Sequence, residues 1–306
     1  MPTITPDGRA GITADLVRRL VDRQFPQWSG LPVTPVPVDG WDNRTYRLGD
    51  TMTARLPTAA GYVPAVAKEH RWLPRLAPHL PVAIPPVLAE GEPGEGYPYP
   101  WSVRGWLPGE TALPHRVEDL AGFAVAVGEF LVALQRCDAT GGPLAGAHSF
   151  YRGTSPAYYD EETRRCLELL KARTDRFDIG LAEEVWAAAL ATTWEKDPVW
   201  FHGDVGSGNL LVTDGQLTAA IDFGTCGIGD PACDLVIAWH MFSGAARQAF
   251  RDTVAQDDGT WARARGWALW KAALVLSECI DTDPEKAADH ARVIDEVLAD
   301  HRRTTT

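Results

Sequence analysis

Apolar positions along the chain follow strand-like spacing in the first third and helical spacing in most of the rest. Residues 13–24 place apolar side chains on one helical face behind Thr13, a good N-cap, which predicts a short amphipathic helix. Residues 33–57 form short runs separated by turn-forming residues, which is typical of an antiparallel β region. Residues 64–76 return to helical spacing, and the Pro- and Gly-rich segment that follows predicts two further strands.

From residue 120 onwards, helical spacing dominates. Residues 120–137 are apolar almost all round, which is typical of a helix buried in a core. Short strands around the turn Thr213-Asp214-Gly215 interrupt the helices between residues 198 and 223. The other expected helices span residues 155–171, 181–194, 234–242, 260–277 and 284–302. This order predicts an α+β fold in which a β-rich lobe, residues 1–104, precedes a mostly helical lobe, residues 105–306.

Composition narrows the class of protein. Of the 306 residues, 45% are hydrophobic and 23% are charged, which is ordinary for a globular protein, and no apolar run reaches the ~18 residues of a membrane span. The N-terminus lacks the basic and apolar segments of a secretion leader, and five cysteines without CxxC spacing predict reduced thiols in the cytoplasm. A zinc site formed by Cys226, Cys233 and His202 would fit no usual ligand spacing.

The net charge of −12 is unevenly distributed. Residues 1–110 carry 11 basic and 11 acidic residues, whereas residues 111–306 carry 18 basic and 30 acidic residues. The acidic excess argues against nucleic acid as a partner. It is compatible with a cationic ligand of the helical lobe, and equally with an acidic surface that favours solubility.

Three polar residues on one predicted hairpin indicate phosphoryl-transfer chemistry. Asp204 follows an apolar run, Asn209 begins the next strand, and Asp222 ends the returning strand. A loop carboxylate can orient a hydroxyl and accept its proton, while an amide and a second carboxylate supply hard oxygen ligands for Mg²⁺. His202 either joins the proton transfer or orders the loop through hydrogen bonds, and we favour the ordering role.

The same segment resembles a known family. Residues 202–209, HGDVGSGN, and residues 221–224, IDFG, are similar to the catalytic and metal-binding loops of the aminoglycoside phosphotransferase family, part of the protein-kinase-like superfamily. Residues 229–235, GDPACDL, match a third motif of that family. The resemblance covers the whole chain, because the β-rich lobe, the linker and the helical lobe come in the family's order.

The resemblance implies a fold and a role for each motif residue. The implied fold is bilobal and protein-kinase-like, with a small antiparallel sheet in the N-lobe and a larger helical C-lobe. Asp204 is implied as the catalytic base, Asn209 and Asp222 as magnesium ligands, and ATP or GTP as the phosphate donor. Asp230 and Asp234 are expected to cap a helix and brace the loop.

The N-lobe contains the expected nucleotide site. Residues 37–48 resemble a phosphate-covering loop whose backbone N–H groups could cradle phosphates. A hinge at residues 102–107 is expected to bind the adenine edge, with large apolar side chains enclosing the ring. The residues assigned to the loop and the hinge are Gly40, Asn43, Thr45, Val103 and Trp106.

One position departs from the kinase pattern. Kinase-like proteins place a Lys on the third strand and pair it with a Glu on the next helix. Here Arg55 and Glu69 occupy these places, with Lys68 as an alternative cation. Because the forked head group of arginine is larger than an ammonium, the preference between ATP and GTP stays open.

The acceptor is expected in the helical lobe. Acidic side chains there are candidates for contacts with a cationic acceptor, and tryptophan for an apolar wall, although both are also typical of helix ends and cores. These candidates are Asp160, Glu161, Glu278, Asp281 and Trp239. The expected acceptor is a small-molecule hydroxyl, an aminoglycoside-like or other antibiotic, with choline, a sugar or a nucleoside as the alternative. A monomer and a homodimer are equally compatible with the sequence.

Two rival interpretations are weaker. Residues 227–232, GIGDPA, fit the G-x-G-x-x-A dinucleotide pattern, but the preceding strand belongs to a hairpin and not to a βαβ unit. A nucleotide-binding regulator without activity would not need Asp204, Asn209 and Asp222 together. We therefore expect an ATP- or GTP-dependent O-phosphotransferase that uses Mg²⁺.

Overall fold

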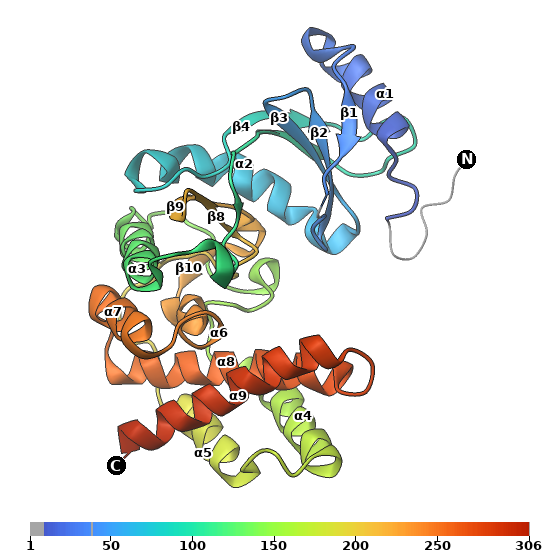
Figure 1. Cartoon of the computed structure of the whole chain (residues 1–306). Helices are drawn as coiled ribbons and strands as arrows, with labels where there is room; N and C mark the ends of the chain where they lie inside the picture. Colours follow the sequence, from blue (N-terminus) through green and yellow to red (C-terminus); the bar gives the residue numbers. More distant parts are fainter. Residues whose placement is uncertain (1–8, 38, 306) are drawn as a thin grey trace.

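A five-stranded antiparallel sheet forms one end of the molecule, with helix α1, Ala14–Gln24, on its outer face (Figure 1). The computed structural model describes residues 9–37 and 39–305, so residues 1–8, on which our expectation of a leader-free N-terminus rests, lie outside the described part. The strand order is β1-β2-β3-β5-β4. The strands are β1 Val33–Pro35, β2 Asn43–Leu48, β3 Met52–Pro57, β4 Val87–Gly91 and β5 Trp101–Gly105.

Helix α1 covers a small core of its own. The side chain of Thr13 accepts a hydrogen bond from the Leu16 N–H at 3.2 Å, which confirms the predicted N-cap. The apolar face of the helix packs on alternate side chains of the strands, including Ala54 of β3 and Val103 of β5. Each large apolar side chain buried there contributes about 1.5–3 kcal/mol, so this layer holds the sheet in shape.

Helix α2, Pro64–Leu76, lies between the sheet and the rest of the chain (Figure 1). Its apolar residues Trp72, Leu73 and Leu76 belong to the core cluster of the helical lobe. The ring centroids of Trp72 and Trp200 lie 4.9 Å apart. The expected boundary near residue 104 therefore separates the two lobes along the sequence. In space, α2 precedes this boundary but packs against the lobe that follows it.

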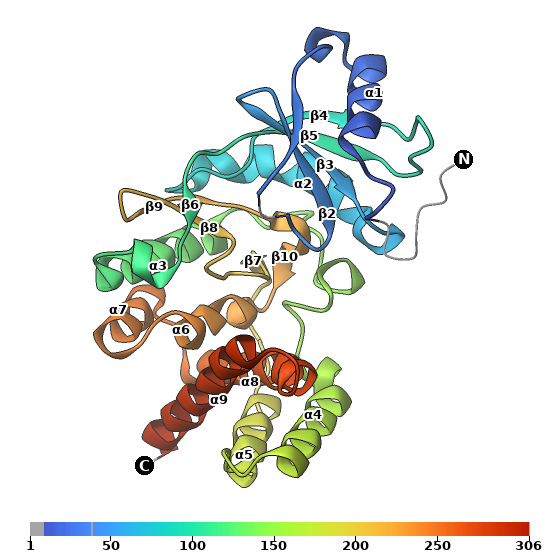
Figure 2. The same cartoon turned by 45° about the vertical axis from the view of Figure 1, so that its right-hand side comes forward.

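The helical lobe stacks its long helices away from the sheet (Figure 2). Helix α3 is buried along its length, as predicted. The helices are α3 Leu120–Arg136, α4 Asp160–Arg173, α5 Ile179–Leu190, α6 Ile237–His240, α7 Gly244–Val254, α8 Asp258–Cys279 and α9 Pro284–Thr305. None of the described helices combines the length and apolar character needed to cross a bilayer.

Two helical expectations were wrong. Residues 234–242 were expected to form one helix, but a 3-10 helix, Pro231–Val236, runs into the single turn of α6. Helix α7 was not expected, because its many small residues weaken the apolar pattern. Its buried face consists mainly of Ala246, Phe250 and Val254, four residues apart.

Short strands carry the segment between α5 and α6. These are β7 Val199–Phe201, β8 Leu210–Thr213, β9 Gln216–Ala220 and β10 Gly227–Gly229, and β6 Glu110–Thr111 joins β8 from the linker. The β8–β9 hairpin turns at Asp214 and Gly215, both at positive φ, as the turn sequence predicts. Strand β10 pairs antiparallel with β7 and precedes a 3-10 helix, which excludes the dinucleotide-binding interpretation of this segment.

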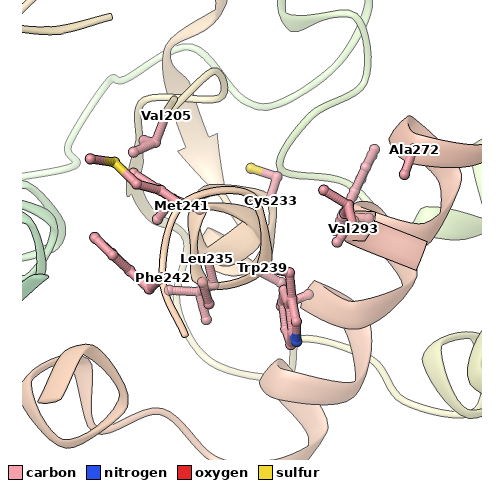
Figure 3. Packing of buried hydrophobic residues seen from close by; sticks show 14 of the residues in the cluster. Val205, Cys233, Leu235, Trp239, Met241, Phe242, Ala272 and Val293 are labelled. Carbon is pink, nitrogen blue, oxygen red and sulfur yellow. The ribbon is translucent and has the colours of Figure 1, made fainter. Parts of the chain in front are cut away.

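Apolar side chains from the β7–α6 segment, α8 and α9 fill the core of the helical lobe (Figure 3). Trp239 is fully buried in this core and its ring centroid lies 5.8 Å from that of Trp261. The expectation that Trp239 lines an acceptor pocket was therefore wrong. All five cysteines are buried free thiols, and the described residues contain no cluster of His, Cys, Asp and Glu that could hold zinc.

Candidate active site

The loop between β7 and β8 is ordered from beneath by a buried carboxylate. Asp234 accepts hydrogen bonds from the backbone N–H groups of His202 at 2.7 Å and Gly203 at 2.6 Å. Gly203 has a φ of 87°, which favours glycine at this point. Burial raises the pKa of Asp234 to about 6, while both N–H groups favour its charged form. Asp234 therefore braces the loop, as expected.

His202 uses both ring nitrogens within the loop. Its Nε2 lies 3.0 Å from the carbonyl oxygen of Ile221, and its Nδ1 accepts from the Asp204 N–H at 3.2 Å. The side chain is buried against Phe223. Because neither nitrogen is left for an acceptor hydroxyl, the geometry supports the ordering role and not proton transfer.

Asp204 is exposed and is held by Asn209. The Asn209 Nδ2 donates to the carbonyl oxygen of Asp204 and to its carboxylate Oδ2, each at 2.9 Å. These two bonds fix the carboxylate while leaving it open to solvent. They also leave the Oδ1 of Asn209 as the atom available for a cation.

Asp222 lies beside Asn209 through the register of the hairpin. The Ile221 N–H donates to the Asn209 carbonyl at 2.8 Å, so the predicted juxtaposition is present. Asp222 adopts φ 65° and ψ 67°, a left-handed conformation that is uncommon for residues other than glycine. Such strain at a polar residue is typical of functional sites.

The oxygen atoms at this point fit Mg²⁺. Asn209 and Asp222 could supply two protein ligands, and Mg²⁺ commonly completes its shell with phosphate oxygens and water. A third carboxylate, Asp42, approaches from the loop before β2. Burial, together with the negative charges of Asp222 and Asp204, raises its pKa to about 6. A cation here would neutralise this concentration of negative charge.

Arg55 on β3 connects the sheet to Asp222. Its Nη2 lies 3.1 Å from Asp222 Oδ1, and its Nη1 lies 3.5 Å from Glu69 Oε1 on α2. Against the effect of burial, the two carboxylates raise the pKa of Arg55. The expected strand-to-helix pairing with Glu69 is therefore present, and a surface position for Arg55 is excluded.

The face of the sheet around Arg55 carries two more predicted residues. Thr45 lies directly opposite Arg55 on β2, and Asn43 lies two residues further along the same face. Gly40 precedes them in an exposed loop, and its carbonyl accepts from Arg9 at 2.9 Å. These positions are compatible with a phosphate-binding loop over Arg55.

Val103, one of the two predicted hinge residues, lies away from this face. The side chain of Val103 is buried on the opposite face of the sheet, in the core under α1, because neighbouring residues of a strand point to opposite faces. Its predicted contact with the adenine ring is therefore corrected. Trp106 is 37% exposed and lies beneath the guanidinium of Arg47, 4.0 Å from the ring centroid.

Comparison with known proteins places the chain in a family. Residues 33–267 match the model of the phosphotransferase enzyme family, APH. The chain belongs to the phosphotransferase enzyme family. No curated protein sequence matches the chain. The match to the family model spans both lobes of this phosphotransferase, including the loop around Asp204 and the Arg55–Asp222 pair.

Solved structures share the fold of this phosphotransferase. The GDP complex of wild-type aminoglycoside 2'-phosphotransferase-IIIa superposes with a TM-score of 0.69 at 18% identity, covering 95% of this chain and 100% of that one. The apoenzyme of a macrolide 2'-phosphotransferase from Brachybacterium faecium superposes with a TM-score of 0.57 at 24% identity, covering 92% and 97%. These similarities confirm the bilobal, kinase-like α+β fold.

The acidic candidates of this phosphotransferase do not form one acceptor site. Asp160 accepts from Arg164 at 2.8 Å and from the Trp186 indole at 2.6 Å, and Asp281 pairs with Arg173 at 3.0 Å on the surface. Glu161 and Glu278 are exposed at the ends of α4 and α8. Asp160 and Asp281 therefore join elements of the fold, and their assignment to a cationic acceptor is not supported.

Two polar contacts beside the site were not predicted from the sequence. Arg104 of β5 is buried and donates to the second oxygen of Glu69 at 3.2 Å. Lys68 of α2 donates to the carbonyl of Gly224 at 2.7 Å, which ties α2 to the segment after Asp222. Spacing could not reveal these contacts, because Lys68 and Gly224 lie 156 residues apart in the chain.

Proposed function

We propose that this protein transfers the γ-phosphate of ATP or GTP to a hydroxyl group of a small molecule, with Mg²⁺ as the cofactor. One observation carries the proposal: Asp204 is an exposed carboxylate fixed by Asn209, beside an Asp222 that Arg55 reaches from the other lobe. A positioned carboxylate, two hard oxygen ligands and an arginine are the groups that phosphoryl transfer requires.

Each side chain would have one task. Asp204 would accept the proton of the acceptor hydroxyl, and Asn209 would keep its carboxylate aimed. Arg55 would bind phosphate oxygens of the nucleotide while Glu69 holds its guanidinium in place. Mg²⁺ bound by Asn209 and Asp222 would supply neutralisation of the phosphate charge.

Similar folds indicate which acceptors to test first. The similar structures include a complex with GDP and kanamycin, a ternary complex with streptomycin and ATP, and macrolide kinases. Antibiotics, and hence a role in resistance, are therefore the first acceptors to test, with metabolite hydroxyls as the alternative. A cytoplasmic location, where both nucleotides and Mg²⁺ are abundant, suits this activity.

Transfer of labelled γ-phosphate from ATP and GTP to a panel of antibiotics and metabolites tests the proposal. Asp204→Ala is expected to lower kcat at least ~10²-fold, as for the loss of a positioned base, while nucleotide binding is retained. Asp197→Ala, at an exposed loop residue, is the matched control. Wild-type turnover in Asp204→Ala would remove the assigned base and with it the proposed mechanism.

A further inference from the structure

Two half-buried cations of the helical lobe form no ion pair with a carboxylate of the described residues. Arg152 lies in the loop before α4, with its guanidinium 5.6 Å from the ring centroid of Trp270 and 5.8 Å from that of Phe150. Lys271 follows Trp270 on α8. Neither side chain makes a hydrogen bond or ion pair with any residue that the structure describes.

The position of Arg152 is fixed by the same segment that orders the active site. The Asp230 N–H donates to the carbonyl of Gly153 at 2.9 Å. A Cβ atom on Gly229 would lie 2.3 Å from that same carbonyl oxygen, so this backbone contact is close. Arg152 is thereby held beside the family motif that begins at Gly229.

Lys271 and Arg152 share one electrostatic neighbourhood with the proposed base. Burial lowers the pKa of Lys271, and the charge of Arg152 lowers it further, whereas Asp204 and the exposed Glu278 act in the opposite direction. Arg152 also acts on Asp42 of the phosphate loop. Lys271 therefore lies within electrostatic range of Asp204, and Arg152 within range of Lys271 and Asp42.

Two imidazoles lie within electrostatic range of Lys271. The rings of His240 and His290 lie 6.0 Å apart, and burial, together with smaller effects of His290, Arg292 and Lys271, lowers the pKa of His240 to about 4. The Nδ1 of His290 is buried without a hydrogen-bond partner among the described residues. The charge of Lys271 lowers the pKa of both rings.

A charge that is partly removed from water without a counter-ion is costly, and two like charges near each other add to that cost. A bound anion would remove both costs, whereas a polycation such as an aminoglycoside would add to them. We propose that the acceptor of this phosphotransferase carries an anionic group, a carboxylate, phosphate or sulfate, that Lys271 and Arg152 bind while its hydroxyl meets Asp204. This inference rests on the proposed function.

Sulfate is a simple probe of the anion site. Thermal unfolding in sulfate and in chloride of equal ionic strength is compared for the wild type, Lys271→Met and Lys171→Met, an exposed lysine on α4 as the matched control. The general effect of the salt is common to all three proteins. The wild type and Lys171→Met are expected to gain more stability in sulfate than Lys271→Met, because a ligand that binds the folded state stabilises it. Equal gains in all three proteins would overturn the proposal.

Bound nucleotide distinguishes two possible ligands of Lys271, an anionic group of the acceptor and the γ-phosphate of the donor. The sulfate comparison is repeated on protein loaded with Mg²⁺ and either ADP or a non-hydrolysable ATP analogue. A sulfate effect at Lys271 that persists with both nucleotides supports an acceptor anion. An effect that is present with ADP and lost with the ATP analogue would assign Lys271 to the γ-phosphate of the donor and overturn the proposal.

Turnover separates this inference from the proposed function. Hydroxyl acceptors matched in size but anionic, neutral or cationic, beginning with gluconate, glucose and glucosamine and extending to kanamycin, are compared for phosphate transfer. Loss of a charge-assisted contact in Lys271→Met is expected to lower kcat/KM for an anionic acceptor ~10-fold or more. A cationic acceptor used equally well by the wild type and Lys271→Met would overturn the inference but leave the proposed function intact. A sulfate site at Lys271 without transfer to any acceptor would contradict the proposed function and leave only an anion-binding site.

Discussion

Arg55 Nη2 and Asp222 Oδ1 lie 3.1 Å apart and join two residues that are 167 positions apart in the chain. Glu69 holds the same guanidinium from α2 at 3.5 Å. A forked guanidinium can contact two carboxylates with different nitrogens, whereas the single ammonium of the more usual lysine is a point charge. A nucleotide phosphate bound here would compete with Asp222 for Arg55, so this pair couples the position of the sheet to that of the segment proposed to bind the metal.

Replacing Arg55 should weaken nucleotide binding. Because Arg55→Ala removes a charge-assisted contact to phosphate, we expect the nucleotide KM to rise ~10-fold or more, and Arg55→Lys to give an intermediate value. Steady-state kinetics with ATP and GTP measure both. Arg23→Ala, at an exposed α1 residue, is the control. A nucleotide KM unchanged in Arg55→Ala would show that the arginine only joins the two lobes.

Asp222→Ala should abolish the dependence of nucleotide binding on Mg²⁺. The substitution removes one of two protein oxygen ligands, so the metal would lose its link to the protein. Calorimetric titration of nucleotide with Mg²⁺ and with a chelator should give the same weak affinity in this variant and a clear difference in the wild type. Asp252→Ala on the surface of α7 serves as the control. Retained Mg²⁺ dependence in Asp222→Ala would remove its metal role.

Arg263 and Asp230 should be important for stability. Their Nε–Oδ2 distance is 2.6 Å and both side chains are almost completely buried. Because Arg263→Met leaves the Asp230 carboxylate buried without its counter-ion, we expect a loss of about 3–5 kcal/mol in the free energy of unfolding by denaturant titration. Breaking the exposed Arg164–Asp160 pair should cost less than about 1 kcal/mol. If breaking the Arg164–Asp160 pair lowered the free energy of unfolding as much as Arg263→Met does, burial would not explain the importance of the Arg263–Asp230 pair.

The sequence predicted the parts of the site that are local in the chain. The hairpin register alone brings Asn209 near Asp222, and Thr13 caps the helix that follows it. Contacts over long separations were missed, because periodicity carries no information on which elements meet. Arg104 reaches Glu69 across 35 residues, and Arg152 contacts Trp270 from a loop far away in sequence.

The acidic excess of the helical lobe was misleading for a physical reason. A count of charges does not show which of them are already paired. Asp160 and Asp281 each face an arginine, whereas Arg152 and Lys271 have no such partner among the described residues. The net charge of the lobe therefore does not show which charged groups are still available to a ligand.

Acid should remove a stabilising interaction at the start of α8. Asp257 accepts hydrogen bonds from the Thr260 N–H at 2.8 Å and from Lys196 Nζ at 2.7 Å. The hydrogen bond from Lys196, together with those from Thr260 and against a smaller effect of burial, lowers the pKa of Asp257 to about 2. A depressed carboxyl pKa contributes stability above its unfolded value near 4, and the contribution is lost as the pH falls towards 2.

Asp257→Ala is therefore expected to lower the Tm at pH 7 by roughly 2–4 °C, since an N-cap is worth about 1 kcal/mol and this carboxylate is half exposed. The difference from the wild type should shrink between about pH 4 and pH 2, where the folded carboxylate becomes protonated. Lys196→Met should move this window upwards, because it removes the largest cause of the low pKa. Thermal unfolding at a series of pH values measures both effects. A difference between Asp257→Ala and the wild type that stays constant down to pH 2 would show that the carboxylate charge does not stabilise α8.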